Sequence, residues 1–219
     1  VFTVFDLDDL LINLPAEHPL FGHYEKNKIA VIDILRTVDL VTVSTRQLQD
    51  SYQRYNAQIN VLPNLIDPVI WRQVFPTVSN KIIKIGYAGT PFHVYDFRNV
   101  IPAVKYILKQ YVEKVEFVFI GCLPDELKGM PGITYHKVVN SYREYAELLQ
   151  HYNFDFMLAP LEDNAFNRCK SNIKFLEYSI CGYPGIYSAV GPYLESVVDN
   201  RTGILTANTP QGWITAIEK

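Results

Sequence analysis

The sequence is poor in the residues that form disulfides and metal sites. Its 219 residues include three cysteines and five histidines. Cys122, Cys169 and Cys181 show no close pairing pattern and are odd in number, which is typical of a chain in a reducing cytoplasm. The histidines are scattered without the spacing of metal ligands, so we predict no metal site and no resident cofactor.

Excess positive charge and long apolar runs are also missing. The formal net charge is −3, whereas a nucleic-acid-binding protein normally presents a basic face. No apolar run reaches the roughly eighteen residues that a membrane-spanning helix needs. The first apolar segment has no initiator methionine and no signal-peptide flank before it. We therefore expect a cytoplasmic protein that binds no nucleic acid, and a sequence that begins inside a larger protein.

What the sequence does contain is an alternation of apolar runs with segments of helical period, which is the pattern of an α/β fold. With 48% hydrophobic and 20% charged residues, it can bury a core. We predict strands at 1–7, 39–44, 59–64, 81–89, 114–121, 132–139, 154–161, 183–188 and 203–207. We predict helices at 27–37, 45–55 (capped by Ser44), 97–111, 141–151 (capped by Ser141), 171–181, 192–198 and from 210 onward.

The pattern divides into two modules. Residues 67–80 contain prolines and no period, which indicates an interdomain linker. Residues 81–219 hold six predicted strands and form a complete Rossmann-like, doubly wound parallel sheet. Residues 1–66 hold only three, and three strands with two helices rarely cover both faces of a parallel sheet. We expect this first module to be the C-terminal part of a truncated Rossmann-like domain.

Three loops at predicted strand ends are candidates for a binding site, because ligands of doubly wound sheets bind outside the carboxyl ends of the strands. In "GYAGTPFHVYDF", Gly89 and Thr90 end a strand, where bare backbone N–H groups can approach a phosphate. A plain strand-to-helix turn explains the same residues. In 138–141 the backbone is placed to recognise the edge of a base, although capping alone also explains Ser141.

The third loop, in "APLEDNAFNRCKSNIKFLEYSICGYPGIYS", is the most informative. Lys170, Lys174 and Glu177 follow one another at i, i+4 and i+7, which predicts one helix face. Two ammonium groups near a helix N-terminus would bind an anion, and a carboxylate two turns in accepts hydrogen bonds from a diol such as ribose. The alternative is a solvated face with a Lys174–Glu177 ion pair.

The succession of "GYAGT", "FIG", "YREYAELL", "DFMLAPL", "FNRCKSNIKFLEYSICGYPGIYS" and "GPYLESVVDNRTGIL" resembles the donor domain of family-4-type glycosyltransferases. "VSTRQL" and "INVLPNLID" resemble the end of that family's acceptor domain. The resemblance implies the GT-B type of fold and retaining, metal-independent transfer of a sugar from a nucleotide-diphosphate sugar. It also implies a hexosyltransferase-like enzyme with a glycan or lipid-linked acceptor, as in polysaccharide biosynthesis, and peripheral association of the full-length protein with the inner membrane face.

By the same resemblance, Glu177 holds the ribose hydroxyls, and Gly89 and Thr90 lie over the diphosphate. The family's first motif glutamate is replaced by Cys169, and the usual Arg and Lys of the first loop are missing, which leaves His93 as the only basic residue there. We therefore assign the basic role to Arg168, Lys170 and Lys174. The predicted donor-binding residues are Gly89, Thr90, His93, Val139, Asn167, Arg168, Lys170, Ser171, Lys174 and Glu177, and the predicted catalytic residues are Lys170 and Asp9.

The opening "VFDLDDLL" permits a second interpretation, because Asp6 and Asp8 have the spacing of a haloacid dehalogenase-like phosphatase. That enzyme would have a small residue and Thr or Val after Asp8, and Asp9 and Leu10 stand there instead. In the glycosyltransferase interpretation, Asp9 faces the cleft and contacts acceptor hydroxyls, while a cap or a buried salt bridge explains Asp6 equally well. A non-catalytic nucleotide-binding or regulatory module on the same fold also stays open, because fold does not fix function. Inactivity of the 219-residue chain on its own likewise stays open.

Overall fold

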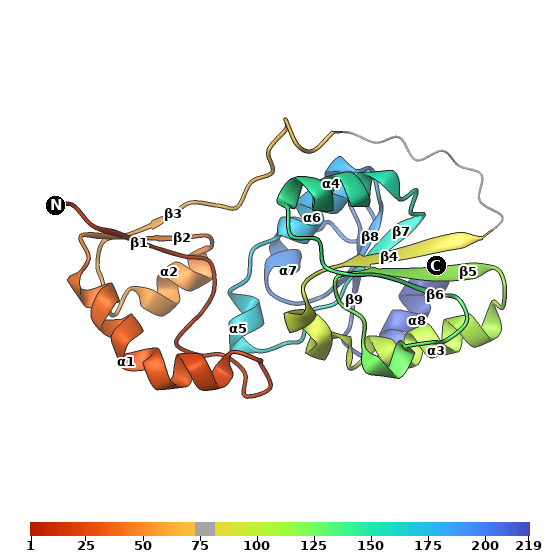
Figure 1. Ribbon diagram of the computed structural model, residues 1–219, viewed down its shortest axis with the longest axis horizontal. Helices are drawn as coiled ribbons and strands as arrows, with labels where there is room; N and C mark the ends of the chain where they lie inside the picture. The colour runs from red at the N-terminus through yellow and green to blue at the C-terminus, as the bar shows by residue number, and fades with distance from the viewer. Residues whose placement is uncertain (73–81) are drawn as a thin grey trace. The chain divides into compact units, whose positions relative to one another are not determined.

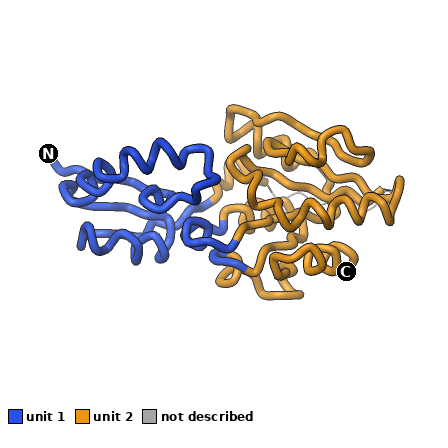
Figure 2. Tube along the Cα trace, turned by 90° about the horizontal axis from the view of Figure 1, so that it is seen from below, with its two compact units in different colours: residues 1–65, 163–172, 190–192 blue, residues 66–162, 173–189, 193–219 orange. Residues whose placement is uncertain are grey.

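A computed structural model describes residues 1–72 and 82–219. The chain divides into two compact units, shown in different colours in Figure 2. Unit 1 contains residues 1–65, 163–172 and 190–192, and unit 2 contains residues 66–162, 173–189 and 193–219. The sequence-based boundary near residue 66 is close to the first of these divisions, but the assignment of 163–172 to unit 1 has no counterpart in the prediction.

Unit 1 is built on a parallel sheet of three strands in the order β1-β2-β3. Its core combines Leu7 and Val43 from the strands with Leu35 and Leu48 from the helices, so both helices cover one face of the sheet (Figure 1). Phe166, from far along the chain, joins the same core. The elements are β1 (Val4–Leu7), α1 (Phe21–Thr37), β2 (Leu40–Val43), α2 (Arg46–Tyr52), β3 (Ile59–Val61) and α5 (Ala165–Arg168).

Two details of the unit 1 helices differ from the prediction. Helix α1 begins at Phe21 rather than near residue 27, because Phe21 and Tyr24 pack against the unit 1 core and extend the apolar stripe by a turn and a half. Helix α2 is capped by Thr45 rather than by Ser44: the Thr45 hydroxyl accepts a hydrogen bond from the Leu48 amide at 3.2 Å.

The described part of the predicted linker is ordered into a turn. The Asp67 carbonyl accepts hydrogen bonds from the amides of Ile70 and Trp71 at 3.0 and 2.9 Å. The Trp71 side chain is 1% exposed. Residues 73–81, the rest of the predicted linker and the first residue of the next predicted strand, lie outside the described residues.

Unit 2 contains a parallel sheet of six strands in the order β6-β5-β4-β7-β8-β9. The chain fills one side of β4 first and then returns to the other side, so the strand order reverses next to β4. The strands are β4 (Ile83–Ala88), β5 (Val115–Ile120), β6 (Ile133–His136), β7 (Phe156–Ala159), β8 (Gly185–Ser188) and β9 (Ile204–Thr206). The helices around the sheet are α3 (Val100–Gln110), α4 (Tyr142–His151), α6 (Ile173–Ile180), α7 (Pro192–Ser196) and α8 (Pro210–Glu218), with 3₁₀ turns at Pro91–Phe97 and Asp125–Leu127.

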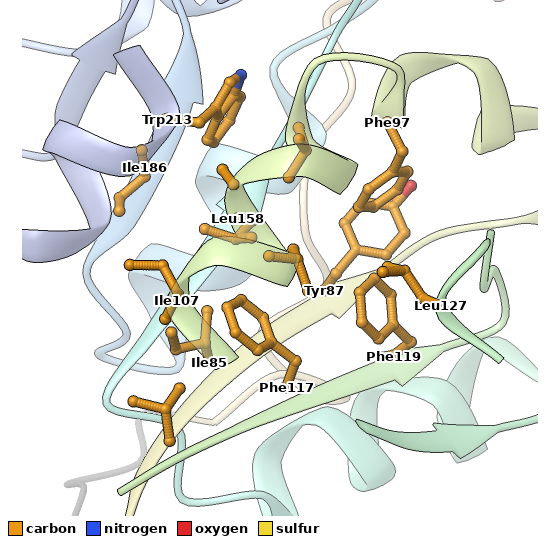
Figure 3. Close-up of a cluster of buried hydrophobic side chains, with 14 of the residues drawn as sticks. Ile85, Tyr87, Phe97, Ile107, Phe117, Phe119, Leu127, Leu158, Ile186 and Trp213 are labelled. Atoms are coloured by element: carbon orange, nitrogen blue, oxygen red, sulfur yellow. The ribbon is translucent and has the colours of Figure 1, made fainter. Parts of the chain in front are cut away.

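Helices α3 and α8 cover one face of this sheet, and α4 and α6 lie on the other (Figure 1). The core under α3 and α8 is rich in aromatic rings (Figure 3). Tyr87 and Phe97 meet edge to face, with ring centroids 4.5 Å apart, and Phe119 packs beside both. Such pairs add about 0.5–1.5 kcal/mol beyond the burial of their apolar area. They fix the end of β4, where the loop to the next helix begins.

The predicted fold class is confirmed: both sheets are parallel, with three strands in unit 1 and six in unit 2 among the described residues. The helix predicted at 171–181 begins later, at Ile173, and a short helix capped by Asn164 precedes it. Within the described ranges, no helix combines the length and apolarity that crossing a bilayer requires.

The two residues before α2 give a test of the cap. We expect Thr45→Ala to lower the free energy of unfolding by about 1–3 kcal/mol, because it removes the N-cap and also the hydrogen bond that the Thr45 hydroxyl donates to the Cys169 carbonyl at 2.8 Å, and Thr45→Ser to restore it. Ser44→Ala should leave stability unchanged or raise it, because the buried Ser44 hydroxyl has no hydrogen-bond partner among the described residues. Urea unfolding followed by circular dichroism measures all three, and equal losses at the two positions would contradict the assignment.

Candidate functional site

A pocket of about 290 Å³ lies in unit 2 at the carboxyl ends of β4, β5 and β6. The loop after β4 contributes Gly89, Thr90 and His93, and the end of β5 contributes Ile120 and Gly121. Residues 138–142, which lead from the loop after β6 to the first residue of α4, form a further wall, and Tyr145, Ile173, Lys174 and Glu177 complete the lining. The pocket therefore lies beside β4, where the strand order reverses and where doubly wound sheets bind their ligands.

Strand register brings two glycines together in the pocket. Ala88 pairs with Ile120, so Gly89 and Gly121 follow at the same level of the sheet. Gly121 has φ +83°, and a Cβ there would lie 2.4 Å from the Gly89 carbonyl oxygen. Any side chain at this position would both strain the backbone and collide with the neighbouring strand end. The glycine keeps the backbone of this wall open to a ligand.

Glu177 is a buried carboxylate, 5% exposed, on the second turn of α6. One of its oxygens, Oε2, accepts a hydrogen bond from the Tyr145 hydroxyl at 2.8 Å. Burial raises the pKa of the Glu177 carboxyl above its usual value, while the nearby Lys174 ammonium and the Tyr145 hydrogen bond act in the opposite direction. Burial beside this carboxylate also raises the pKa of Tyr145 well above its usual value, so Tyr145 stays a hydrogen-bond donor.

Lys174 supplies a positive charge to the pocket. Its Nζ donates to the Ala88 carbonyl oxygen at 2.5 Å, and it lies 5.2 Å from the centre of the Tyr87 ring, over its face. A Cβ on Gly89 would come within 3.1 Å of the same Nζ. The ammonium group is thus fixed against the end of β4, beside the open backbone of the first loop.

His93 is the basic residue of the loop after β4. Its Nδ1 lies 2.8 Å from Oδ2 of Asp96, whose side chain is 6% exposed. The other oxygen of Asp96 accepts a hydrogen bond from the Glu162 amide at 2.8 Å. Asp96 therefore orients the imidazole and would stabilise its protonated form.

The pocket brings together six of the ten residues predicted to bind a donor. The other four lie in unit 1, and the prediction that Lys170 shares a helix face with Lys174 and Glu177 is wrong, because α6 begins only at Ile173. The six in the pocket are Gly89, Thr90, His93, Val139, Lys174 and Glu177, and the four in unit 1 are Asn167, Arg168, Lys170 and Ser171.

The Lys170 ammonium is bonded within unit 1 to Asp9, the other predicted catalytic residue. Its Nζ lies 2.9 Å from Oδ1 of Asp9 and 4.4 Å from the centre of the Phe166 ring. The Asn64 amide donates both to Ser171 Oγ at 2.9 Å and to Asp8 at 3.0 Å. These bonds attach 163–172 to the loop after β1 and to the chain after β3.

The remaining residues of these motifs have local partners. Arg168 forms a two-pronged ion pair with Asp163, with N–O distances of 2.6 and 3.0 Å. Asn167 is 5% exposed inside unit 1. Asp6 accepts a hydrogen bond from the Thr42 hydroxyl. Asp6, Asp8 and Asp9 thus bond to three different partners, which gives no support to the phosphatase interpretation.

Sequence reasoning missed two tyrosines and a glycine of the pocket. Tyr142 and Tyr145 are spaced three apart at the start of the capped helix "SYREYAELL", which places both on one face of α4. Gly121 follows a buried strand directly. Each signal is present in the sequence, but only the pairing of β4 with β5 and the packing of α4 against α6 bring them to one place. Within the described ranges, no three His, Cys, Asp or Glu side chains gather in a group that could hold a metal ion.

Comparison of the sequence with protein families gives one match, to the model described as "Glycosyl transferases group 1", over residues 80–219. A search against curated proteins finds no match. The family model covers more than half of the chain and contains every residue that lines the pocket.

Solved structures with the same fold include several glycosyltransferases. Sucrose-phosphate synthase from Thermosynechococcus elongatus is 16% identical, with a TM-score of 0.66 over 98% of this chain and 57% of the other. Anabaena HepE, crystallised with UDP and glucose, is 14% identical, with a TM-score of 0.67 over 98% of this chain and 60% of the other. A variant of S. aureus TarM, crystallised with Fondaparinux, α-GlcNAc-glycerol and UDP, is 11% identical, with a TM-score of 0.70 over 100% of this chain and 44% of the other.

The chain thus spans about half the length of these structural neighbours. At these identities the likeness establishes the fold, while the family rests on the match over residues 80–219. The pocket at the strand ends, the GT-B type of fold and the family match agree with one another. The chain belongs to the group 1 family of glycosyl transferases.

Proposed function

We propose that the pocket of unit 2 binds a nucleotide-diphosphate sugar, and that the protein transfers the sugar to a glycan or lipid-linked acceptor. The observation that carries this proposal is the buried Glu177 carboxylate beside the Lys174 ammonium, at strand ends whose backbone is left open by two glycines. Removing a carboxylate from water costs free energy of folding, so a buried one suggests that it binds a ligand. The two hydroxyls of a ribose would suit this carboxylate, because an ionised carboxylate has about four acceptor sites and the Tyr145 hydroxyl uses only one of them.

The other charges of the pocket suit a diphosphate. Lys174 is held at the end of β4, and His93 beside Asp96, once protonated, would offer a second cationic group in the loop after β4. As the sugar–phosphate bond breaks, negative charge grows on the leaving diphosphate, and fixed donors in a water-poor site stabilise that charge. These residues would do this without a metal ion. Transfer with retention of the anomeric configuration belongs to the same proposal.

UDP is our first choice of nucleotide, because HepE and TarM were both crystallised with it. Both are structural neighbours of the whole chain. A hexose as the transferred sugar, and peripheral association with the inner membrane face through a lipid-linked acceptor, remain parts of the proposal. Asp9 and Lys170 are our candidates for the acceptor side, where an ion pair of 2.9 Å would orient a carboxylate toward a hydroxyl.

A non-catalytic nucleotide-binding module is the second candidate, favoured by one observation. Cys169 occupies the position where the resemblance leads us to expect a glutamate, and its side chain is buried in the unit 1 core, 3.7 Å from Ser51 Oγ. Burial raises the pKa of this thiol, so it carries no negative charge at neutral pH. Sugar transfer from a radiolabelled nucleotide sugar by the chain would exclude this candidate. Nucleotide binding without transfer would favour it.

Calorimetric titration with UDP, GDP and ADP tests the donor site. We expect one nucleotide to bind, and Glu177→Gln and Lys174→Met each to weaken it roughly 10- to 100-fold, since a hydrogen bond to a charged group contributes about 1.5–3 kcal/mol. Glu147→Gln and Lys105→Met are the matched controls, because both side chains are outside the pocket lining. If no nucleotide binds the wild-type chain, or if the controls lose as much affinity, the proposal fails.

The melting temperature of Glu177→Gln shows whether a loss of nucleotide affinity in this variant comes from misfolding. Because the pKa of Glu177 is raised in the folded state, the folded chain holds its proton more tightly than the unfolded chain. Stability from this group is therefore full at low pH and declines as the pH rises above the unfolded pKa. We expect Glu177→Gln to melt at a higher temperature than the wild type at pH 8 while it loses nucleotide affinity. A lower melting temperature would contradict the cost that we assign to the buried charge.

Binding should also depend on pH. Acidification protonates Glu177 and removes the acceptor of the ribose hydroxyls, so affinity falls as the pH drops through the raised pKa, by up to about tenfold per pH unit. UDP-glucose is the better probe, because the free phosphate of UDP itself titrates near pH 6. His93→Gln removes the imidazole of the loop after β4, so that a change of affinity with pH does not depend on it. An affinity of His93→Gln that does not fall on acidification, down to the lowest pH at which the protein stays folded, would contradict the role of Glu177.

A further inference from the structure

The segment that follows β3 contains a buried tryptophan, Trp71. After the turn at Asp67, whose Oδ1 accepts from the Val69 amide at 2.8 Å, Trp71 packs against α4. The next amide, of Arg72, donates to Gln150 Oε1 at 2.9 Å. The segment is therefore fastened to α4 by a side chain and by backbone hydrogen bonds, although its sequence has the appearance of a linker.

Trp71 contacts the two tyrosines that α4 contributes to the pocket. Its Nε1 donates to the Tyr142 hydroxyl at 2.7 Å. Its ring meets both tyrosine rings edge-on, with centroids 5.9 Å apart in each case. The tyrosine rings stack on each other at 29°. Trp71 thus contacts Tyr142 and Tyr145 on the side away from the pocket. Its own side chain is 1% exposed and is not part of the pocket lining.

The same contacts lead to the buried carboxylate. Tyr145, whose ring contacts both Trp71 and Tyr142, donates its hydroxyl hydrogen to Glu177. Tyr142 receives its hydrogen bond from Trp71, so its own hydroxyl hydrogen is left to donate elsewhere. The Tyr142 side chain is half-exposed at the pocket wall, where a ligand can meet its ring or its hydroxyl.

We propose that Trp71 is a positioning residue of the nucleotide pocket: it orients Tyr142 and Tyr145, and through Tyr145 the carboxylate of Glu177. The inference rests on the proposed function, because it concerns how the pocket is prepared for a nucleotide. A side chain held in place before binding costs less entropy when the nucleotide arrives, so the positioning appears as affinity.

The alternative is that Trp71 only adds stability, and Trp213 provides the comparison. Both indoles are fully buried in unit 2, but Trp213 belongs to α8 on the opposite face of the sheet and lies outside the pocket lining. Its Nε1 has no hydrogen-bond partner among the described residues. Trp213→Phe therefore makes the same ring change without touching the tyrosines.

The experiment compares Trp71→Phe, Trp213→Phe and Tyr142→Phe by calorimetric titration with UDP, GDP and ADP at a temperature well below all their melting points. We expect Trp71→Phe to weaken the nucleotide that binds the wild type by roughly 3- to 10-fold, since it removes one hydrogen bond of about 0.5–1.5 kcal/mol. Trp213→Phe should bind the nucleotide with wild-type affinity, even if its melting temperature falls as much as that of Trp71→Phe.

A double-mutant cycle tests whether Trp71 affects nucleotide affinity through Tyr142. If Trp71 acts through Tyr142, Trp71→Phe together with Tyr142→Phe should weaken binding no more than the larger single change, because both remove the same hydrogen bond. Additive effects would overturn the path through Tyr142. Unchanged affinity in Trp71→Phe, with affinity lost in Glu177→Gln, would overturn the positioning role and leave the proposed function standing. Absence of nucleotide binding by the wild type would overturn both.

Fluorescence gives a readout that stability does not affect. In Trp213→Phe, Trp71 is the only tryptophan, and its indole is bonded to a tyrosine of the pocket wall. We expect saturating nucleotide to change its emission, with a midpoint equal to the calorimetric Kd. In Trp71→Phe, emission from Trp213 should stay constant during the same titration. An unchanging Trp71 signal in a protein that binds the nucleotide would count against the proposal.

Discussion

The pairing of β4 with β5 is the constraint on which unit 2 depends. The parallel register places Ala88 opposite Ile120, so β4 and β5 end at the same level. A glycine, Gly89 or Gly121, follows each strand directly. Beside them, β6 ends at His136, whose carbonyl accepts the Gly121 amide. The three strand ends form an edge of open backbone, and α4 and α6 supply the side chains above it. A shift of one residue in this register would turn each inward side chain outward.

The pocket gathers several groups that do little for stability. Burial raises the pKa of the Glu177 carboxyl, Gly121 has an unfavourable backbone conformation for any other residue, and the Lys174 ammonium donates a hydrogen bond to the Ala88 carbonyl at the end of β4. The aromatic core on the opposite face, with Tyr87, Phe97 and Phe119, compensates for these costs. In unit 2 the apolar core under α3 and α8 supplies stability, and the strand ends supply the polar groups of the pocket. A parallel sheet allows this division because helices cover both of its faces.

Local pattern was enough to predict the strands, because each is a short apolar run bounded by glycine or polar residues. The six predicted residues that meet in the pocket were found because they lie directly after strands or early in a helix. Lys170 was misplaced for a physical reason: helical spacing from Lys174 and Glu177 is a local signal, whereas its partner Asp9 is 161 residues away. Trp71 was missed because a proline-containing segment without a period gives no local sign that one of its side chains is buried against α4.

The excursion of residues 163–172 into unit 1 has a consequence for the order in which the protein is made. Phe166 and Cys169 belong to the unit 1 core, and the Cys169 carbonyl accepts a hydrogen bond from Thr45, 124 positions earlier. Because residues 163–172 follow β1, β2 and β3 in the chain, the core of unit 1 can be complete only after β7 and α5 have been synthesised. A chain divided after Leu65 would separate unit 1 from part of its own interior.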